Sequence, residues 1–441
     1  MKAHQGRVLV ILSLALLLPE VRAQEFEPQS PVGGPMEVPI TLNGQRPSTA
    51  LKSEKIRGSY LSGGIALGSI FTDNFLLSST DRVSNVGYLV QPHVNVAQTR
   101  ARVNWQVGFE ALLMANHPIR EENQAAEHLT LDVSYRLAQH VNLRVSSAVS
   151  NVNGLFSALN PVTSGPGIGV IQQANNSLLV PFTQRIISTS NLAELNYQFG
   201  PHSIVGARGT YSISDYPGFS NNAQFGSLYN SRMYSGETFY DSQISPRQWV
   251  GVTLRTQKFE TKPLADTRTA SSLLLYALSV RPSVTFSLFA GPEWFESPQI
   301  SNTATAAGLI RGWTPAGGAT LTWQGVRTSM LAEFSRQLND GGGLASAVTF
   351  ETANAELRRQ LSSRQELSFR FTYTKNDALE SGQSLSGFFG QCQFQQRVAK
   401  SLITLIGYTR EQQEYLNGHG IATANLLWLS LSYDFSRGLG R

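Results

Sequence analysis

The feature that most constrains the fold of this chain is a repeated rhythm of alternating segments joined by connections of two lengths. Between Gly58 and Phe435, an alternating run of about ten residues is followed by a tight turn, a second alternating run and a longer polar loop. The tight turns are expected at residues 98–100, 138–140, 200–202, 245–247, 281–283, 324–325, 362–364 and 399–400. The long loops are expected at residues 73–85, 114–124, 152–185, 214–228, 259–269, 296–309, 338–345, 375–386 and 411–421. This regular exchange of short and long connections is typical of a transmembrane β-barrel.

Eight turns and nine loops separate eighteen strands. The sequence therefore predicts an all-β fold, a transmembrane antiparallel up-and-down β-barrel of about 18 strands. Sixteen strands is the alternative, because boundaries taken from pattern alone drift by several residues. An even count places both ends of the barrel on the periplasmic side. A soluble β-sandwich or propeller is the weaker interpretation, since neither requires turns and loops to alternate by length.

The two faces of the strands separate by polarity with a period of two residues. One face of the fourth segment carries Leu129, Leu131, Val133, Tyr135 and Leu137, and the other carries Thr130, Asp132, Ser134 and Arg136. The segments around Trp105 and Phe369 alternate in the same way. The apolar face suits lipid and the polar face suits a lumen that contains water.

Aromatic residues gather near the two ends of the predicted strands, where a barrel meets the interfaces of a bilayer. The expected periplasmic girdle consists of Tyr135, Tyr197, Phe199, Trp323, Tyr433 and Phe435. The expected outer girdle consists of Phe109, Tyr211, Trp294, Phe334, Tyr373 and Tyr408. The phase of the alternation predicts that all these side chains point outward.

The first 23 residues have the layout of a secretory signal peptide. Lys2, His4 and Arg7 precede an apolar run from Val8 to Leu18, and a small-residue cleavage pattern ends at Ala23. The alternative, a first buried helix of a cytosolic protein, does not explain why the three regions occur together in this order. We expect the domains to be a signal peptide at 1–23, a periplasmic tail at 24–57 and an outer-membrane barrel at 58–441.

Composition excludes several other classes of protein. The mean hydropathy is −0.15, and no later segment approaches the roughly 18 apolar residues of a membrane-spanning helix. The single cysteine, Cys392, cannot form an internal disulfide or a cysteine-based metal site. The 35 basic residues are dispersed along the strands and form no recognition motif, so a nucleic-acid partner is not expected.

The opening of the barrel region carries motifs that point to a family. Phe71-Thr72-Asp73-Asn74 is followed by Val86 to Val90, by Gln91-Pro92-His93-Val94 and by Arg102 to Phe109. This stretch resembles the first hairpins of porin-like outer-membrane barrels encoded near exopolysaccharide genes. In that family an aromatic-x-Asp-Asn motif ends the first strand and a proline interrupts the second. The resemblance implies a porin-like channel for small solutes or an acidic exopolysaccharide, with polysaccharide-export components as partners.

The lumen is the place where the chemistry of such a barrel is expected. The predicted lumen-facing residues are Arg102, Arg136, Arg144, Arg208, Arg255, Arg327, Arg358 and Arg370, with the acids Glu110, Asp132, Glu194, Glu293, Glu333 and Glu356. Arginine binds carboxylate and phosphate groups through two parallel hydrogen bonds, so one interpretation is a conduit that favours anions. The other is that the arginines pair with the acids and brace the wall.

The longest connection, residues 152–185, is rich in glycine and proline. Loops of this length are usually functional or disordered, and the sequence leaves open whether this loop narrows the lumen or lies on the surface. It also leaves open whether residues 24–57 occlude the pore.

No catalytic site or cofactor is expected. The chain contains no Gly-x-Ser-x-Gly and no His-Glu-x-x-His motif. A non-transporting anchor or adhesin is the main alternative to a channel, and a barrel hydrolase is the weaker one. The expected partners are outer-membrane lipid, lipopolysaccharide and the barrel-assembly machinery, because the last strand, Asn425 to Phe435, ends in alternating aromatics.

Overall fold

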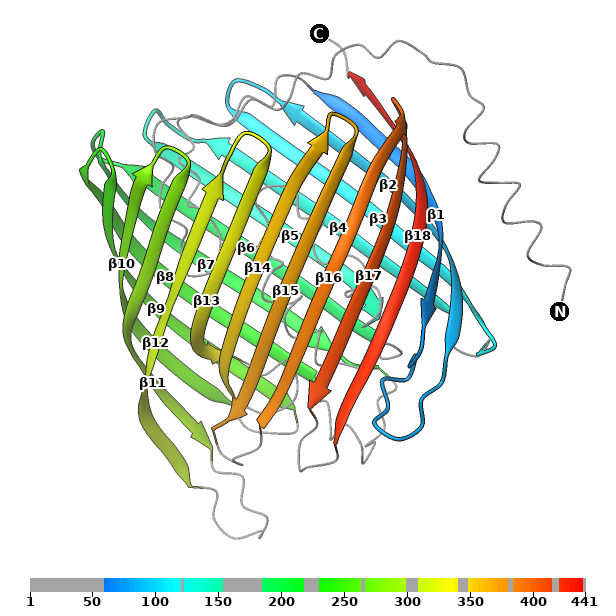
Figure 1. Cartoon of the computed structure of the whole chain (residues 1–441). Coiled ribbons are helices and arrows are strands. Elements are labelled where there is room, and N and C mark those ends of the chain that lie inside the picture. The colour runs from blue at the N-terminus through cyan, green and yellow to red at the C-terminus, as the bar shows by residue number, and fades with distance from the viewer. Residues whose placement is uncertain are drawn as a thin grey trace, which may run out of the picture.

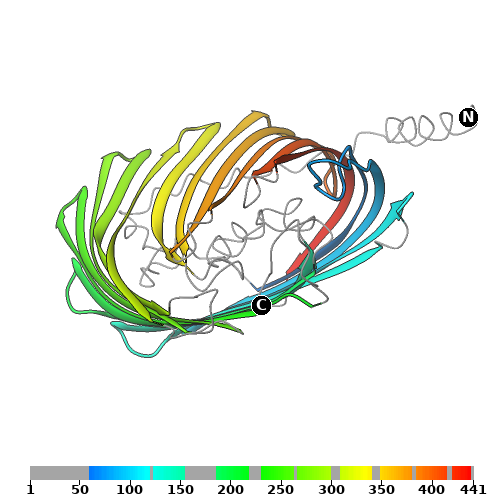
Figure 2. The same ribbon diagram turned by 90° about the horizontal axis from the view of Figure 1, so that it is seen from below.

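A computed structural model describes residues 59–119, 123–153, 185–217, 230–262, 266–298, 308–339, 348–379, 384–414 and 420–438. These residues form one antiparallel sheet of 18 strands in which each strand pairs with its neighbours in the sequence. The first strand also pairs with the last, so the sheet closes into a barrel. Figure 1 shows the barrel from the side, and Figure 2 shows it along its axis.

The strands are twelve to eighteen residues long. The first nine are β1 (Tyr60–Thr72), β2 (Asn85–Thr99), β3 (Val103–His117), β4 (Gln124–Arg136), β5 (Val141–Asn153), β6 (Arg185–Gln198), β7 (Ser203–Asp215), β8 (Asn230–Ser245) and β9 (Gln248–Lys262). The second nine are β10 (Thr267–Arg281), β11 (Val284–Pro298), β12 (Leu309–Gln324), β13 (Thr328–Asn339), β14 (Val348–Ser362), β15 (Gln365–Ala378), β16 (Ser384–Ala399), β17 (Leu402–Glu414) and β18 (Ile421–Gly438).

The prediction of eighteen antiparallel strands in a closed barrel is confirmed. The short turns lie along the upper rim in Figure 1, where β1 begins and β18 ends with Tyr60 opposite Gly438. Several strands run further toward the long-loop end than predicted, as β3 does in continuing to His117. The predicted signal peptide, the tail at 24–57 and most of the loop at 152–185 lie outside the described residues.

The junction of β1 and β18 closes the barrel, and two residues of the Asp-Asn motif fasten its long-loop end. The carboxylate of Asp73 accepts hydrogen bonds from the backbone N–H of Asn425 at 2.7 Å and from its side-chain amide at 2.6 Å. The side-chain amide of Asn74 donates to the carbonyls of Thr423 at 2.9 Å and of Ser78 at 2.7 Å. The motif therefore joins the first connection to the last strand.

The outer face of the barrel is apolar along its middle and aromatic toward both ends. On β10 the inward residues Thr269, Ser271 and Leu273 are buried, whereas the outward residue Leu274 is 65% exposed. Ten of the twelve predicted girdle residues are exposed large side chains. Tyr211 and Trp294 are half-buried against the outward residues Tyr234 and Trp313. The predicted outward orientation of the aromatic residues is confirmed.

The inner face combines polar rows with apolar clusters. The largest apolar cluster among the described residues gathers Ile70, Met114, Phe389 and Trp428 from strands on both sides of the β1–β18 junction. Phe75, from the connection after β1, completes it. Trp428 lies across Gly407, where an added Cβ would come within 2.3 Å of the indole ring. Only glycine leaves room for the ring there. Within the described ranges, no helix has the length and hydropathy needed to span a membrane.

Candidate functional site

A row of alternating charges crosses the inner face of the barrel over β5 to β11. Cross-strand pairing places Arg144 opposite Glu194, Glu194 opposite Arg208, Arg208 opposite Glu237 and Glu237 opposite Arg255. The row continues through Ser271 on β10 to Glu293 on β11. Because directly opposed residues have Cβ atoms about 5 Å apart, each charge lies next to its opposite on the neighbouring strand.

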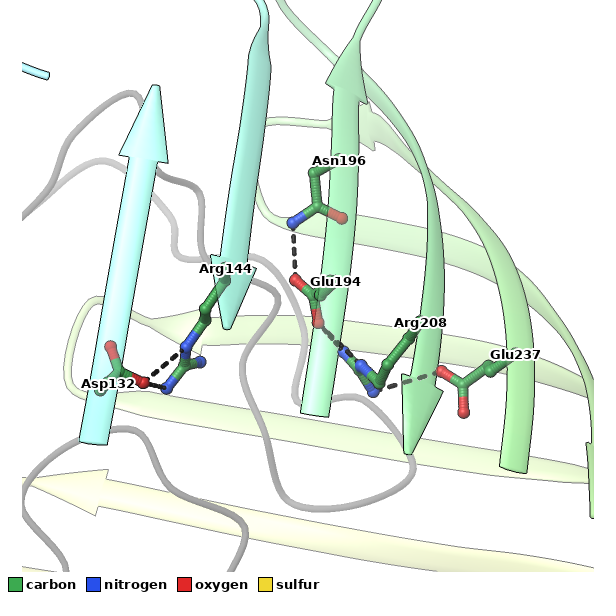
Figure 3. A network of polar contacts seen from close by, with 6 residues as sticks. All are labelled: Asp132, Arg144, Glu194, Asn196, Arg208 and Glu237. Carbon is green, nitrogen blue, oxygen red and sulfur yellow. Dashed lines mark hydrogen bonds and ion pairs between the residues drawn. The ribbon is translucent and has the colours of Figure 1, made fainter. Parts of the chain in front are cut away.

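Arg208 of β7 is the centre of this row (Figure 3). Its guanidinium lies 2.5 Å from Glu194 of β6 and 3.2 Å from Glu237 of β8, and all three side chains are no more than 2% exposed. The amide of Asn196 donates a further hydrogen bond of 2.6 Å to Glu194. The guanidinium carbon also lies 5.6 Å from the centre of the Phe239 ring, a favourable arrangement for a cation. The arginine is therefore fixed from both sides.

The two ends of the row are anchored in the same manner. Arg144 donates two hydrogen bonds, of 2.7 and 3.0 Å, to one oxygen of Asp132 on β4 (Figure 3). Arg255 of β9 reaches past β10 to Glu293 of β11 at 3.0 Å, with side-chain exposures of 2% and 0%. These pairs join β4 to β5 and β9 to β11.

The opposite wall carries a second group of charges. Glu356 of β14 accepts from Arg370 of β15 at 3.1 Å and also pairs with Arg358 of its own strand. The side chains of Arg358 and Arg370 are 53% and 21% exposed. This wall therefore presents charges that solvent and solutes can reach, unlike the buried row.

Two further predicted acids lie on the inner face by alternation. Glu110 of β3 accepts a hydrogen bond from the side-chain amide of Gln91. Glu333 of β13 is half-buried and lies opposite the inward residue Asn354. Close to the turn end of β2, His93 lies 3.1 Å from Asp434 of β18, so this polar pair bridges the strands on either side of β1.

The structure corrects the placement of two predicted lumen residues. Arg102 and Arg327 are exposed residues of the turns before β3 and β13, and they do not belong to a strand face. Their carbonyls accept hydrogen bonds from the N–H groups of Arg136 and Gln360. Each is therefore the last turn residue before the next strand begins. Arg136 is the final residue of β4 and is half-buried.

Glu237 and Asp241 of β8 are among the inward acids that escape the sequence pattern. Both are almost fully buried, with exposures of 4% and 1%. On this strand the inner face also carries Met233 and Phe239, while Tyr234 and Tyr240 lie on the outer face. Because both faces contain large apolar side chains, alternation does not distinguish them. The position of Glu237 between Arg208 and Arg255 becomes apparent only from the strand register.

The inner face of the barrel carries charged side chains at fixed positions. The part of the chain that the structure covers contains no cluster of His, Cys, Asp and Glu residues that could bind a metal ion. The inner acids and arginines are matched within hydrogen-bond distance in the buried row, so their fields largely cancel there. On β14 and β15, by contrast, the side chains of Arg358 and Arg370 remain partly exposed.

Comparison with known proteins yields structures of similar architecture. No protein family and no curated protein matches the chain. Among solved structures, the outer membrane protein opdK from Pseudomonas aeruginosa is 8% identical with a TM-score of 0.44, over 86% of this chain and 99% of that chain. OccAB1 from Acinetobacter baumannii is 9% identical with a TM-score of 0.44, over 87% of this chain and 100% of that chain. Because these identities and TM-scores are low, the fold is assigned from the strand pairing of this chain itself.

Proposed function

We propose that this protein is an outer-membrane channel that passes small polar solutes through the lumen of its barrel. The carrying observation is the closed ladder of eighteen strands with an apolar outer face and a charged inner face. A barrel of 16 to 18 strands is wide enough for an aqueous channel. Soluble proteins rarely expose a continuous apolar band of this extent.

The spacing of the aromatic residues supports insertion into a bilayer. Along β12 the outward residues Trp323 and Trp313 are ten positions apart. At about 3.3 Å per residue and a tilt of about 40°, they mark a band about 25 Å tall, as in outer-membrane barrels. Beyond Trp313 the outer face becomes charged, with Arg311 paired to Glu296 at 2.6 Å.

The proposal also concerns the kind of solute that passes through the lumen. The resemblance of residues 60–150 to barrels encoded near exopolysaccharide genes supports passage of an acidic glycan, and Arg358 and Arg370 supply the cations that such a chain would meet. The signal peptide at 1–23 would deliver the protein to the assembly machinery that recognises its last strand. We infer that the protein acts without a catalytic step, because the charged side chains of its buried inner row are held by one another in fixed pairs.

Liposome swelling tests the proposal. Vesicles containing the folded protein should swell in isotonic solutions of a neutral monosaccharide and of its uronic acid, and swelling should slow as the sugar is lengthened. Faster entry of the uronate would support the glycan proposal. Folded protein that admits neither sugar would contradict the channel and favour an anchor or adhesin.

A further inference from the structure

A second alternating row crosses the inner face at the β1–β18 junction, and its basic members are histidines. Cross-strand pairing places Asp434 of β18 opposite Gly64 of β1, and Gly64 opposite His93 of β2. His93 lies opposite Glu110 of β3, which lies opposite His128 of β4. By the alternation of their strands these side chains point into the lumen. We call Asp434, His93, Glu110 and His128 the histidine row.

The row is continuous because β1 contributes a glycine to it. The Nε2 atom of His93 lies 3.1 Å from Oδ1 of Asp434, although β1 separates their strands. A Cβ on Gly64 would lie 2.5 Å from Oδ1 of Asp434 and 2.8 Å from Cε1 of His93. A side chain at this position would therefore push the two partners apart. The contact between His93 and Asp434 is thus built into the junction.

The two acids of the row also accept hydrogen bonds from neutral side chains. The hydroxyl of Ser432 donates to Oδ1 of Asp434 at 3.0 Å, and the side-chain amide of Gln91 donates to Glu110. These donors carry no charge, so they do not offset the charge of either acid. In the row of β5 to β11 the basic partners are arginines, which stay charged. In the histidine row the charge of the basic partners depends on pH.

The histidine row is more open to the lumen than the row around Arg208. The side chains of His93 and Asp434 are each 36% exposed. Those of Glu110 and His128 are half-buried. The side chains of Arg208 and its two partners are no more than 2% exposed. Protons and small ions that enter the lumen therefore reach the histidine row more easily than the buried one.

The groups that face the two imidazole rings are acidic or neutral. His93 lies between Asp434 on one side and Glu110 on the other. His128 lies between Glu110 and Ser150 of β5. The ion pair that joins β4 to β5 lies further along these strands, and its two charges already offset each other. The nearest acids on both sides therefore favour a positive charge on His93.

Protonation changes the charge of this row in one direction. With neutral rings the row carries the negative charges of Asp434 and Glu110, and with both rings protonated these are balanced. Each proton that any of the four groups takes up raises the charge by one, so the direction does not depend on the order of titration. We propose that the histidine row is a specificity-determining site that shifts the lumen from cations toward anions as the pH falls. This inference rests on the proposed channel function.

The reversal potential in a gradient of potassium chloride tests this inference on the unaltered protein. The permeability of chloride relative to potassium should rise when the pH is lowered from about 7.5 to about 5, the range in which histidine changes its charge. Currents with the same permeability ratio at both pH values would overturn the inference and leave the channel standing. Folded protein that carries no current at either pH would contradict the channel and the inference together.

Matched variants test whether the row causes the change. His93→Gln combined with His128→Gln should remove most of the pH dependence, because glutamine keeps a polar side chain that does not titrate. His202→Gln is the control, since His202 is exposed in the turn before β7, where its ring contacts Gln243 at 3.0 Å. A pH dependence that survives in the double variant, or that His202→Gln reduces equally, would refute the assignment to the row.

Nitrogen NMR of the folded protein with labelled histidine, in lipid nanodiscs, follows the rings without any current. The ring signals of His93 and His128 are identified by their absence in His93→Gln and His128→Gln. We expect these signals to move between the same two pH values as the rings gain a proton. Ring signals that stay fixed would overturn the inference even if the protein conducts. Signals that move in a protein that carries no current would contradict the channel on which the inference depends.

Discussion

Arg208 lies between two carboxylates on neighbouring strands, and the three side chains are almost completely buried. A buried charge is stable only when it is paired, and removal of one partner commonly costs about 3–5 kcal/mol of unfolding free energy. Arg208 is the shared partner of two acids in the inner row. The energetic consequence of this arrangement can be measured by substitution.

We expect Arg208→Met to lower the unfolding free energy by about 3–5 kcal/mol, because Glu194 and Glu237 then lose their shared partner. Urea unfolding of the protein in lipid vesicles would measure the change. The triple variant Arg208→Met with Glu194→Gln and Glu237→Gln should recover much of the loss. Arg247→Ala, at an exposed turn position, is the control. Equal effects of Arg208→Met and Arg247→Ala would disprove the bracing role.

The hydrogen bonds of Asp73 give a second prediction for a single residue, on the stability of the barrel junction. Asp73→Ala removes a carboxylate that accepts two hydrogen bonds from Asn425, each worth about 1.5–3 kcal/mol. We expect a measurable loss of unfolding free energy and faster hydrogen exchange at the β1–β18 pairing. Asp81→Ala, an exposed position of the same connection, should change neither quantity. Unchanged exchange in Asp73→Ala would show that the motif does not fasten the junction.

At the scale of elements, close packing between strands depends on particular small residues. Gly407→Val places side-chain atoms where the indole of Trp428 lies, since even a Cβ would be 2.3 Å from that ring. We expect a shifted tryptophan emission and a loss of about 1–3 kcal/mol, the usual cost of overpacking. Gly209→Ala on β7, where the nearest atom is 4.0 Å away, is the matched control. An unshifted emission spectrum for Gly407→Val would contradict the packing described.

The strands themselves are predictable from the sequence because alternation and turn residues are local signals. Strand ends are less predictable. Arg102 and Arg327 lie in turns because the N–H of Arg100 donates to the carbonyl of Val103, and the N–H of Gly325 donates to that of Thr328. The hydrogen bond from Arg255 of β9 to Gln337 of β13 has no local signal at all, because the two residues are 82 positions apart in the chain. Contacts of this kind appear only once the barrel is closed.

At the scale of the whole molecule, the two walls differ in how far their charges are exposed. The buried row on β5 to β11 contributes little field to the lumen, since its charges are paired. Arg358 and Arg370 on the opposite wall remain partly exposed. Ion selectivity should therefore respond to the second group and not to the first.

Exchange of Arg358 and Arg370 for Gln should lower the permeability of chloride relative to potassium, because positive charge is lost where ions pass. The reversal potential in a salt gradient measures this ratio. Arg359→Gln is a close control, as Arg359 adjoins Arg358 but lies on the outer face by alternation. A shift of the same size in Arg359→Gln would contradict the assignment of the two faces.

The proposed function requires that the barrel spans a membrane and holds an aqueous lumen. Single-channel recording after insertion of the folded protein into a planar bilayer is the direct test. We expect stepwise currents that rise linearly with voltage and with salt concentration. Folded protein that enters the bilayer and carries no current would contradict the proposed function.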